Sequence, residues 1–230
     1  MDTKERPILF SAPMVRAILD GRKTQTRRVV THEWAHGLRN RAKFAPCSGR
    51  DDFVTFSEPY SRWAEKPIWF YSWGNVRWLS CPHGSPKDRL WVRETWAVQH
   101  EYDAAAPSEI DASARWHYAA TEDLGGLRKR PSIFLPRLGS RILVEIIDVR
   151  VQRLQDISED DARAEGIERV GGEHSCSPWR NYLLQPMAPA ALNSSSPCHS
   201  FMTLWESING TGSWDASPWV WAITFRRLQP

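Results

Sequence analysis

The stretch SRILVEIIDVRVQRL, residues 140–154, decides the fold class because it is the strongest strand signal in the chain. It is long and rich in β-branched residues, which favour the pleated strand conformation. Further strands are predicted from apolar patterning at residues 88–98 (DRLWVRETWAV), 114–121 (ARWHYAAT) and 217–228 (SPWVWAITFRRL). The second half of the chain therefore indicates a β-rich core.

The first thirty residues predict a strand, a short helix and a second extended segment. Residues 7–11 have strand character, and Pro13 suits the first turn of a helix. Gly21 stands where a helix needs a left-handed residue to end it. The segment QTRRVV, residues 25–30, then has the composition of an extended chain.

Two more helices are expected towards the C-terminus. Ser158 is a good N-cap for a helix with an acidic first turn, and Gly166 can end that helix. Residues 198–209 are amphipathic, with Phe201, Leu204, Trp205 and Ile208 on one face. Because strands outnumber helices and do not alternate with them, residues 1–230 are predicted to form one α+β domain. Its expected architecture is a small β-barrel with peripheral helices.

Two segments, at about residues 32–86 and 170–196, are irregular and are interpreted as insertions. The first is rich in tryptophan, with one hairpin expected within residues 66–80 (KPIWFYSWGNVRWLS), where Gly-Asn is a turn signal. The chain has thirteen tryptophans, which serve in cores or stack on flat ligands. Core packing is the simpler interpretation for most of them.

The charge is unevenly distributed along the chain. The formal net charge is +3, but residues 1–50 carry eleven Lys and Arg against four Asp and Glu. A basic N-terminal quarter on a mildly acidic body fits an anionic or nucleotide-like partner, or a solvated surface. The four scattered cysteines, the lack of a signal peptide and the lack of a membrane-length apolar run predict a cytoplasmic protein with free thiols.

A zinc-protease pattern occurs in HEWAH, with His32, Glu33 and His36 at the H-E-x-x-H spacing. That motif requires a helix of several turns to place both imidazoles on one face. Here β-like residues precede it, Gly37 follows directly, and no third ligand stands at a recognised spacing. We therefore expect no metal site.

The stretch GRKTQTRR, residues 21–28, combines cations with hydroxyls. A turn would bring the side chains of Lys23 and Thr26 together. A threonine is a nucleophile only when a base takes its proton, and lysine can do so when burial and nearby cations lower its pKa from about 10.4. From the residues alone, a phosphate-contacting turn and a solvated turn remain open beside this catalytic pair.

The spacing of Gly21, Lys23, Thr26 and Arg28 resembles the G-x-K-x-x-[E/T]-x-R signature of the ASCH family, which is related to the RNA-binding PUA fold. The threonine variant is similar to small bacterial N4-acetylcytidine amidohydrolases, and the opening also looks like phage and prophage members. Matching pieces extend to KDRLWVRE, RILVEIIDV, the acidic helix and the C-terminal strand. The two insertions have no counterpart in those small enzymes.

The resemblance implies catalytic roles for Lys23, Thr26 and Glu165 in an amide hydrolase that converts N4-acylated cytosine nucleosides to cytidine and a carboxylic acid. Which acidic residue has the role of Glu165 stays open, since the same helix contains three others, Glu159, Asp160 and Asp161. Thr26 would attack the amide with Lys23 as base, or would position an attacking water. Glu165 would hold Lys23 and pass a proton to the leaving cytosine.

Four further residues are candidates for substrate binding. Arg28 could stabilise the developing oxyanion, and Trp91 and Trp96 could stack on the base. Glu94 is expected on the face of Trp96 and could accept a hydrogen bond from the base or sugar. For these three strand residues, placement in the core or on the surface is the competing interpretation.

Two other functions compete with hydrolysis of a modified nucleoside. An RNA-binding ASCH or PUA-like module, with or without ribonuclease activity, would use the basic segment to contact phosphates. A phage interaction protein without catalysis would not depend on Lys23. The weak net charge favours the small-molecule substrate, and no cofactor, metal or membrane is expected.

Overall fold

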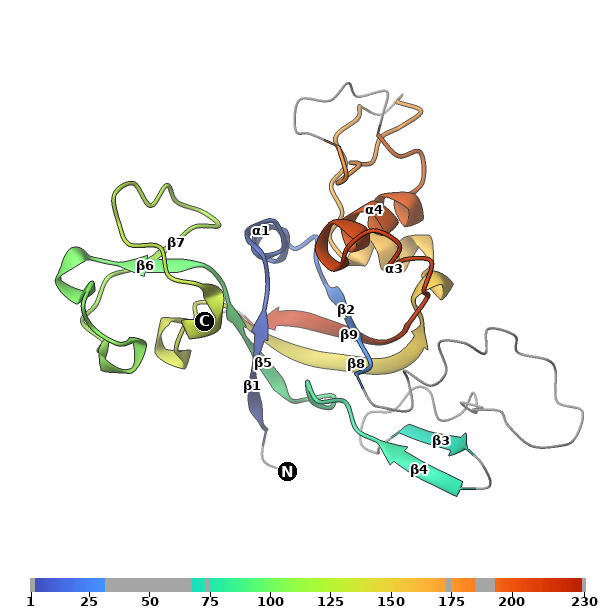
Figure 1. The fold of residues 1–230 in the computed structure, drawn as a ribbon, viewed down its shortest axis with the longest axis horizontal. Coiled ribbons are helices and arrows are strands. Elements are labelled where there is room, and N and C mark those ends of the chain that lie inside the picture. Colours follow the sequence, from blue (N-terminus) through green and yellow to red (C-terminus); the bar gives the residue numbers. More distant parts are fainter. Residues whose placement is uncertain (1–2, 32–67, 73–74, 173–174, 185–192, 229–230) are drawn as a thin grey trace, which may run out of the picture.

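A mixed sheet with helices on one side forms the body of the protein (Figure 1). The computed structural model describes residues 3–31, 68–72, 75–172, 175–184 and 193–228. The strands are β1 (Glu5–Leu9), β2 (Gln25–Val29), β3 (Ile68–Ser72), β4 (Asn75–Leu79), β5 (Arg89–Arg93), β6 (Trp96–Val98), β7 (Trp116–Tyr118), β8 (Leu143–Arg153) and β9 (Trp219–Leu228). The α-helices are α1 (Ala12–Leu19), α3 (Glu159–Ala164) and α4 (Pro197–Asn209).

Short 3-10 helices connect these elements, and the described ones are η3 (His100–Tyr102), η4 (Pro107–Glu109), η5 (Ser132–Phe134), η6 (Arg137–Gly139) and η7 (Leu154–Asp156). The predicted helices and strands of the two ends of the chain are confirmed. Gly21 and Gly166, expected to end helices, have φ of +74° and +86°. Ser158 caps α3, because its hydroxyl accepts a hydrogen bond from the backbone N–H of Asp161.

The main sheet has five strands in the order β1-β5-β8-β9-β2. The strand predicted most strongly becomes β8, which pairs with β9 along most of its length. β1 is parallel to β5, and the other neighbours are antiparallel. Both edge strands come from the first thirty residues, although they lie at opposite ends of the sheet order.

The expected closed barrel is not formed by the described residues. The edge strands β1 and β2 are not hydrogen bonded as neighbours, and α1 with its following turn connects them. The sheet nevertheless brings the two edges together through one side chain, since Arg28 of β2 donates to the carbonyl oxygen of Leu9 in β1 at 2.5 Å. The fold is therefore an α+β arrangement with an open mixed sheet.

The segment 88–98, predicted as one strand, is divided into two strands of different sheets. β5 belongs to the main sheet, and β6 pairs with β7 in a separate two-stranded sheet. The change of sheet follows Glu94, whose carboxylate is fixed by both Arg141 nitrogens Nε and Nη2 at 2.9 and 3.0 Å. The prediction of one continuous strand over residues 88–98 was therefore wrong.

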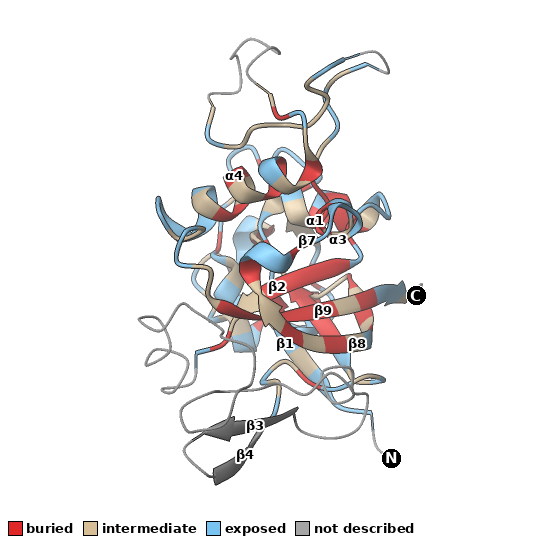
Figure 2. Cartoon of the chain, turned by 90° about the vertical axis from the view of Figure 1, so that its right-hand side faces the viewer, coloured by how far each residue is buried: buried red, intermediate tan, exposed pale blue. Residues whose placement is uncertain are grey.

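Three apolar clusters fill the interior of the described part, whose buried residues are red in Figure 2. The largest lies between α1 and the main sheet, around Ile18, Leu90 and Ile223. A second joins α3 and α4 to β9, and a third surrounds Trp96 beside β6 and β7. Helices α1 and α4 therefore cover neighbouring parts of the sheet, and the candidate site lies near the place where they meet.

The two insertions are described only in part. The expected hairpin is confirmed, since β3 and β4 pair antiparallel with Ser72 opposite Asn75. The described residues of 170–196 form no helix or strand, as predicted, apart from isolated bridges of Trp179. Cys81, Cys176 and Cys198 are free thiols, while Cys47 lies outside the described residues.

Candidate active site

The backbone of Lys23 is held between the ends of α1 and α3. Its N–H donates to the carbonyl oxygen of Ala17 at 2.9 Å, and the next N–H, from Thr24, donates to Ala164 at 2.8 Å. Lys23 also forms an antiparallel bridge with Glu165. Residues 142 positions apart in sequence are thereby joined at the entrance to β2.

A glycine makes this approach possible. A Cβ atom on Gly166 would lie 2.8 Å from the Cβ of Lys23 and 2.9 Å from that of Ala17, closer than such atoms approach in proteins. The φ of +86° at Gly166 also disfavours any side chain. This glycine therefore ends α3 and lets Glu165 reach Lys23.

The amine of Lys23 is fully buried and hydrogen bonded. Its side chain has 0% exposed area, and Nζ donates to Oε2 and to the backbone oxygen of Glu165, both at 2.8 Å. The amine also lies 5.6 Å from the ring centre of Phe10. A charged group in such a place needs a partner of opposite charge, and Glu165 provides it.

Burial lowers the pKa of Lys23, because a charged ammonium is less stable away from water. The carboxylate of Glu165 raises the pKa in part, and the positive charges of Arg28 and Arg27 lower it again. These opposing effects keep the proton on Lys23 less firmly than in water. This is the environment in which a lysine can act as a base.

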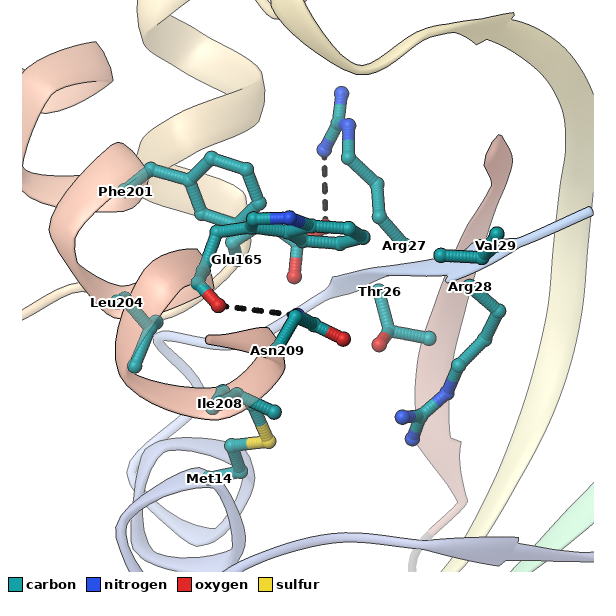
Figure 3. A pocket seen from close by; sticks show the side chains of 11 residues that line it. Met14, Thr26, Arg27, Arg28, Val29, Glu165, Phe201, Leu204, Ile208 and Asn209 are labelled. Carbon is teal, nitrogen blue, oxygen red and sulfur yellow. Dashed lines mark hydrogen bonds and ion pairs between the residues drawn. The ribbon is translucent and has the colours of Figure 1, made fainter. Parts of the chain in front are cut away.

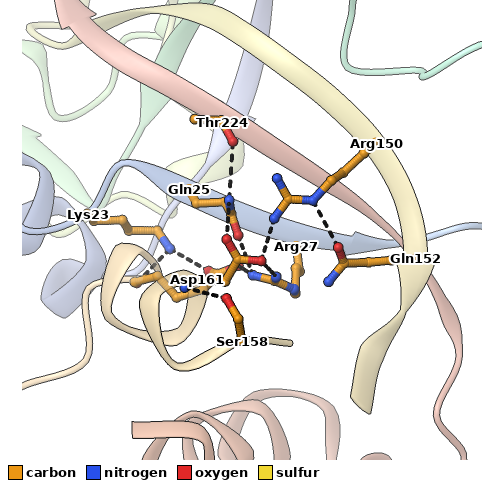
Figure 4. A network of polar contacts seen from close by, with 9 residues as sticks. Lys23, Gln25, Arg27, Arg150, Gln152, Ser158, Asp161 and Thr224 are labelled. Atoms are coloured by element: carbon orange, nitrogen blue, oxygen red, sulfur yellow. Dashed lines mark hydrogen bonds and ion pairs between the residues drawn. The ribbon is translucent and has the colours of Figure 1, made fainter. Parts of the chain in front are cut away.

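The second oxygen of Glu165 connects the pair to a network of charges around Arg27 and Asp161, two residues that Figure 4 labels. Arg27 donates to Oε1 of Glu165 at 2.9 Å and to Oδ2 of Asp161 at 2.8 Å. Asp161 also accepts from Gln25 and Arg150. The carboxylate of Glu165 is therefore oriented from both sides, with one oxygen on Lys23 and the other on Arg27.

The four acidic residues of the α3 region have different partners, so the structure distinguishes their roles. Glu159 and Asp160 are exposed on α3 and pair with Arg163, and Asp161 pairs with Arg27. Glu165, whose side chain is only 3% exposed, is the one that contacts the lysine. The structure thus brings together Lys23 and the glutamate that the resemblance indicated.

Thr26 and Arg28 project from β2 into a pocket that Glu165 also lines (Figure 3). Thr26 is 2% exposed, and the opposite wall comes from α4. The guanidinium of Arg28 lies 5.4 Å from the Phe10 ring, the same ring that Lys23 faces. We call this cavity of about 80 Å³ the Thr26 pocket. Thr26, Arg28 and Glu165 thus line it, and Glu165 connects it to Lys23, which is not itself a lining residue.

The aromatic wall of the Thr26 pocket was not anticipated. It comes from Phe201 and Trp205 of α4, beside the apolar side chains of Leu204 and Ile208. These four residues formed the predicted apolar face of the helix, and the sequence indicated only that this face would be buried. Part of it packs against the domain, and part lines the cavity.

The other three candidate residues do not line this pocket. Trp96 is 0% exposed and packs against Trp116 with ring centres 5.2 Å apart. Trp91 stacks on the guanidinium of Arg93, and Glu94 is 1% exposed and paired with Arg141. Their contacts are those of structural residues, which was the competing interpretation.

Comparisons of the chain with protein-family models, curated proteins and solved structures found no match. Among the described residues, no three His, Cys, Asp or Glu side chains are grouped to hold a metal ion. The pattern of His32, Glu33 and His36 lies outside them. Within the same part of the chain, no helix is long and apolar enough to cross a membrane.

Proposed function

We propose that the protein is an amidohydrolase that removes the acyl group from N4-acylated cytosine nucleosides. The signature of Lys23, Thr26 and Arg28, together with Glu165, resembles that of ASCH-family enzymes with this activity. The finer assignment of the fold, a PUA-like domain with insertions, belongs to the same proposal. The mixed sheet is compatible with it, since Arg28 joins the two edge strands through a hydrogen bond.

The observation that carries the proposal is the buried contact between Lys23 and Glu165. Its two hydrogen bonds, at 2.8 Å each, hold an amine of lowered pKa beside a pocket lined by Thr26. Perturbed ionisable groups next to a cavity are typical of catalytic sites. A solvated turn would not bury its lysine completely.

In the proposed first step, a proton passes from Lys23 to Glu165 within the hydrogen-bonded pair. The neutral amine then accepts the hydroxyl proton of Thr26 while Oγ forms a bond to the amide carbon. The carbonyl electrons move to oxygen, and the cation of Arg28 stabilises the resulting oxyanion.

In the second step, the tetrahedral intermediate collapses and the bond between carbon and N4 breaks. Glu165 gives its proton to N4, so cytidine leaves with a neutral amino group. Water then attacks the acyl–Thr26 ester, which releases the carboxylic acid and restores the hydroxyl. In the alternative route, Lys23 activates water directly and Thr26 positions it.

The RNA-binding alternative has less support from the geometry. It requires the cations of residues 21–28 to face phosphates. The side chains of Lys23 and Arg27 instead have 0% exposed area and are paired with carboxylates. Hydrolysis of an uncharged nucleoside should also change little with salt, whereas binding through phosphates should weaken steeply.

The direct test is hydrolysis of N4-acetylcytidine, followed by its ultraviolet shift to cytidine. Lys23→Ala and Thr26→Ala should each reduce kcat/KM by at least about 10²–10³-fold. Thr24→Ala is the matched control, because Thr24 is an exposed threonine two residues from Thr26. Absence of turnover by the parent protein, or equal rates for the two threonine variants, would refute the proposal.

The covalent route and the direct attack by water differ in one intermediate, the acyl–Thr26 ester. Only the covalent route places an acetyl group on Thr26, which mass spectrometry of a rapidly quenched reaction detects. Peptide mapping locates the adduct. In the direct route, hydrolysis proceeds with Thr26 unmodified at every time.

A further inference from the structure

A second pocket adjoins the Thr26 pocket and is about three times larger, at about 260 Å³ against about 80 Å³. The two cavities share four lining residues, Met14, Glu165, Leu204 and Ile208. Together they reach the lower end of the range of small-molecule sites, about 300 Å³. Glu165 lines both, and it therefore stands where the cavities meet.

We propose that the second pocket binds the nucleoside part of the substrate, as an uncharged nucleoside without a 5′-phosphate, while the acyl group occupies the Thr26 pocket. This inference rests on the proposed function, because it assigns the two halves of the same substrate. It also places the bond to be broken beside Glu165, the residue that protonates N4 in the proposed mechanism.

The walls of the two pockets differ in chemistry. Besides its catalytic groups, the Thr26 pocket is lined by apolar side chains, among them Val29, Phe201 and Trp205. An acyl chain is apolar beyond its carbonyl and fits such walls. The second pocket has an apolar side formed by Met14 and Leu204, but it also contains hydroxyl, guanidinium and carboxylate groups.

The polar groups of the second pocket suit sugar hydroxyls. Arg180 donates to Oε2 of Glu168 at 2.5 Å, and the hydroxyl oxygen of Tyr182 accepts from the backbone N–H of Glu168 at 2.8 Å. Burial raises the pKa of Tyr182 to about 12, so its hydroxyl keeps a proton to donate. Hydroxyl groups both donate and accept hydrogen bonds, and both partners are present here.

Both cations that line the second pocket already have hydrogen-bond partners. Arg16 and Arg180 line it, and Arg16 donates to the carbonyl oxygen of Ala120 at 2.9 Å. The Arg180 guanidinium is already paired with Glu168. A phosphate would need unpaired cations to replace its hydration, whereas a neutral ribose does not. These existing contacts therefore favour a nucleoside over a nucleotide or an RNA chain.

Part of this pocket comes from the segment 170–196, which the sequence indicates as an insertion absent from the small enzymes it resembles. Arg180 and Tyr182 belong to it, and Tyr182 is tied to α4 because its N–H donates to Oγ1 of Thr203 at 3.1 Å. The insertion therefore has a definite place beside the active site. Its described residues enlarge the substrate site on the side of the leaving group.

Ser207→Trp tests the assignment, because Ser207 is an exposed residue of α4 that lines the second pocket. Calorimetry should show cytidine binding to the parent protein and at least about tenfold weaker binding to Ser207→Trp, equal to about 1.4 kcal/mol. In hydrolysis, KM for N4-acetylcytidine should rise by a similar factor. Ser195→Trp, the same change at an exposed serine outside both pockets, is the control.

Cytidine 5′-monophosphate is the second probe, and it should bind no more tightly than cytidine. Tighter binding of the monophosphate by about tenfold, or unchanged cytidine binding in Ser207→Trp, would overturn the inference. Failure of the proposed function is a separate result. In that case the cytidine titrations behave as expected while N4-acetylcytidine is not hydrolysed by the parent protein.

Discussion

Replacing Glu165 with glutamine should destabilise the protein more than removing Lys23, because the two residues have different numbers of partners. Glu165 pairs with both Lys23 and Arg27, at 2.8 and 2.9 Å. Glu165→Gln therefore leaves a fully buried ammonium without its carboxylate. Lys23→Met leaves a carboxylate that Arg27 still neutralises.

The contacts give the size of the two effects. At 2.8 Å and an effective dielectric constant of about 20, Coulomb's law gives an attraction of about 6 kcal/mol. Relaxation reduces this, and breaking a buried pair costs about 3–5 kcal/mol. Lys23→Met should cost about 1.5–3 kcal/mol, the range for a hydrogen bond to a charged group. For a chain of this length, Glu165→Gln then lowers Tm by roughly 6–20 °C.

The pH dependence identifies the cause. Without Glu165, the pKa of Lys23 in the folded state falls further below its unfolded value of about 10.4. The unfolded state then binds more protons between the two values, so the stability of Glu165→Gln rises with pH in that interval. The rise can reach about 1.4 kcal/mol per pH unit.

Urea denaturation of both variants between pH 7 and 10 measures these quantities. Lys23→Met lacks the titrating amine and should show a smaller rise than Glu165→Gln. If Lys23→Met were the less stable variant, or if both had the same pH profile, then the Lys23 amine would not depend on Glu165 for its charge. The combined variant is the control for unrelated damage, since it removes both charges together.

Three further predictions concern stability and use the same denaturation assay. Gly166→Ala should cost at least about 1 kcal/mol, because its φ is +86° and its new Cβ would lie 2.8 Å from Lys23. Arg141→Met should cost about 3–5 kcal/mol by leaving the buried carboxylate of Glu94 without this partner, and unchanged stability would contradict a structural role for that pair. Asp161 has a lowered pKa, because the effects of Arg150, Arg27 and Gln25 exceed the opposing effect of burial. Its contribution is therefore present above about pH 3.9 and is lost as pH falls through its lower folded value. As pH falls over that range, Asp161→Asn should lose less stability than the parent protein. Parallel curves of stability against pH for the two proteins would contradict this contribution of the Asp161 carboxylate.

Much of the fold could be predicted from local sequence. Proline, glycine and serine mark the ends of α1 and α3, and β-branched residues mark β8. These signals act within a few residues, so a single sequence contains them. The break after Glu94 coincides instead with the contact of Glu94 to Arg141, which lies 47 positions away, and no local pattern indicates this contact.

The candidate site was predictable to the extent that the spacing of Lys23, Thr26 and Arg28 is a motif. Its distant partner Glu165 came from resemblance, and only the fold separates it from the acidic residues beside it. Trp91 and Trp96, which the sequence suggested for binding the base, do not line the Thr26 pocket, and the reason is physical. An aromatic residue in a strand has the same pattern whether it faces a cavity or the core, and Trp96 faces the core.

The position of β1 and β2 at opposite edges of the sheet has a consequence for biosynthesis. Thr26 is made well before Ile223, yet its strand pairs with β9, where Thr26 lies opposite Ile223. A nascent chain therefore carries the strand of Thr26 without its partner until β9 leaves the ribosome. Until then β2 lacks its inner partner, whereas β1 can pair as soon as β5 has been made, and a chaperone that holds β2 would protect it from mispairing.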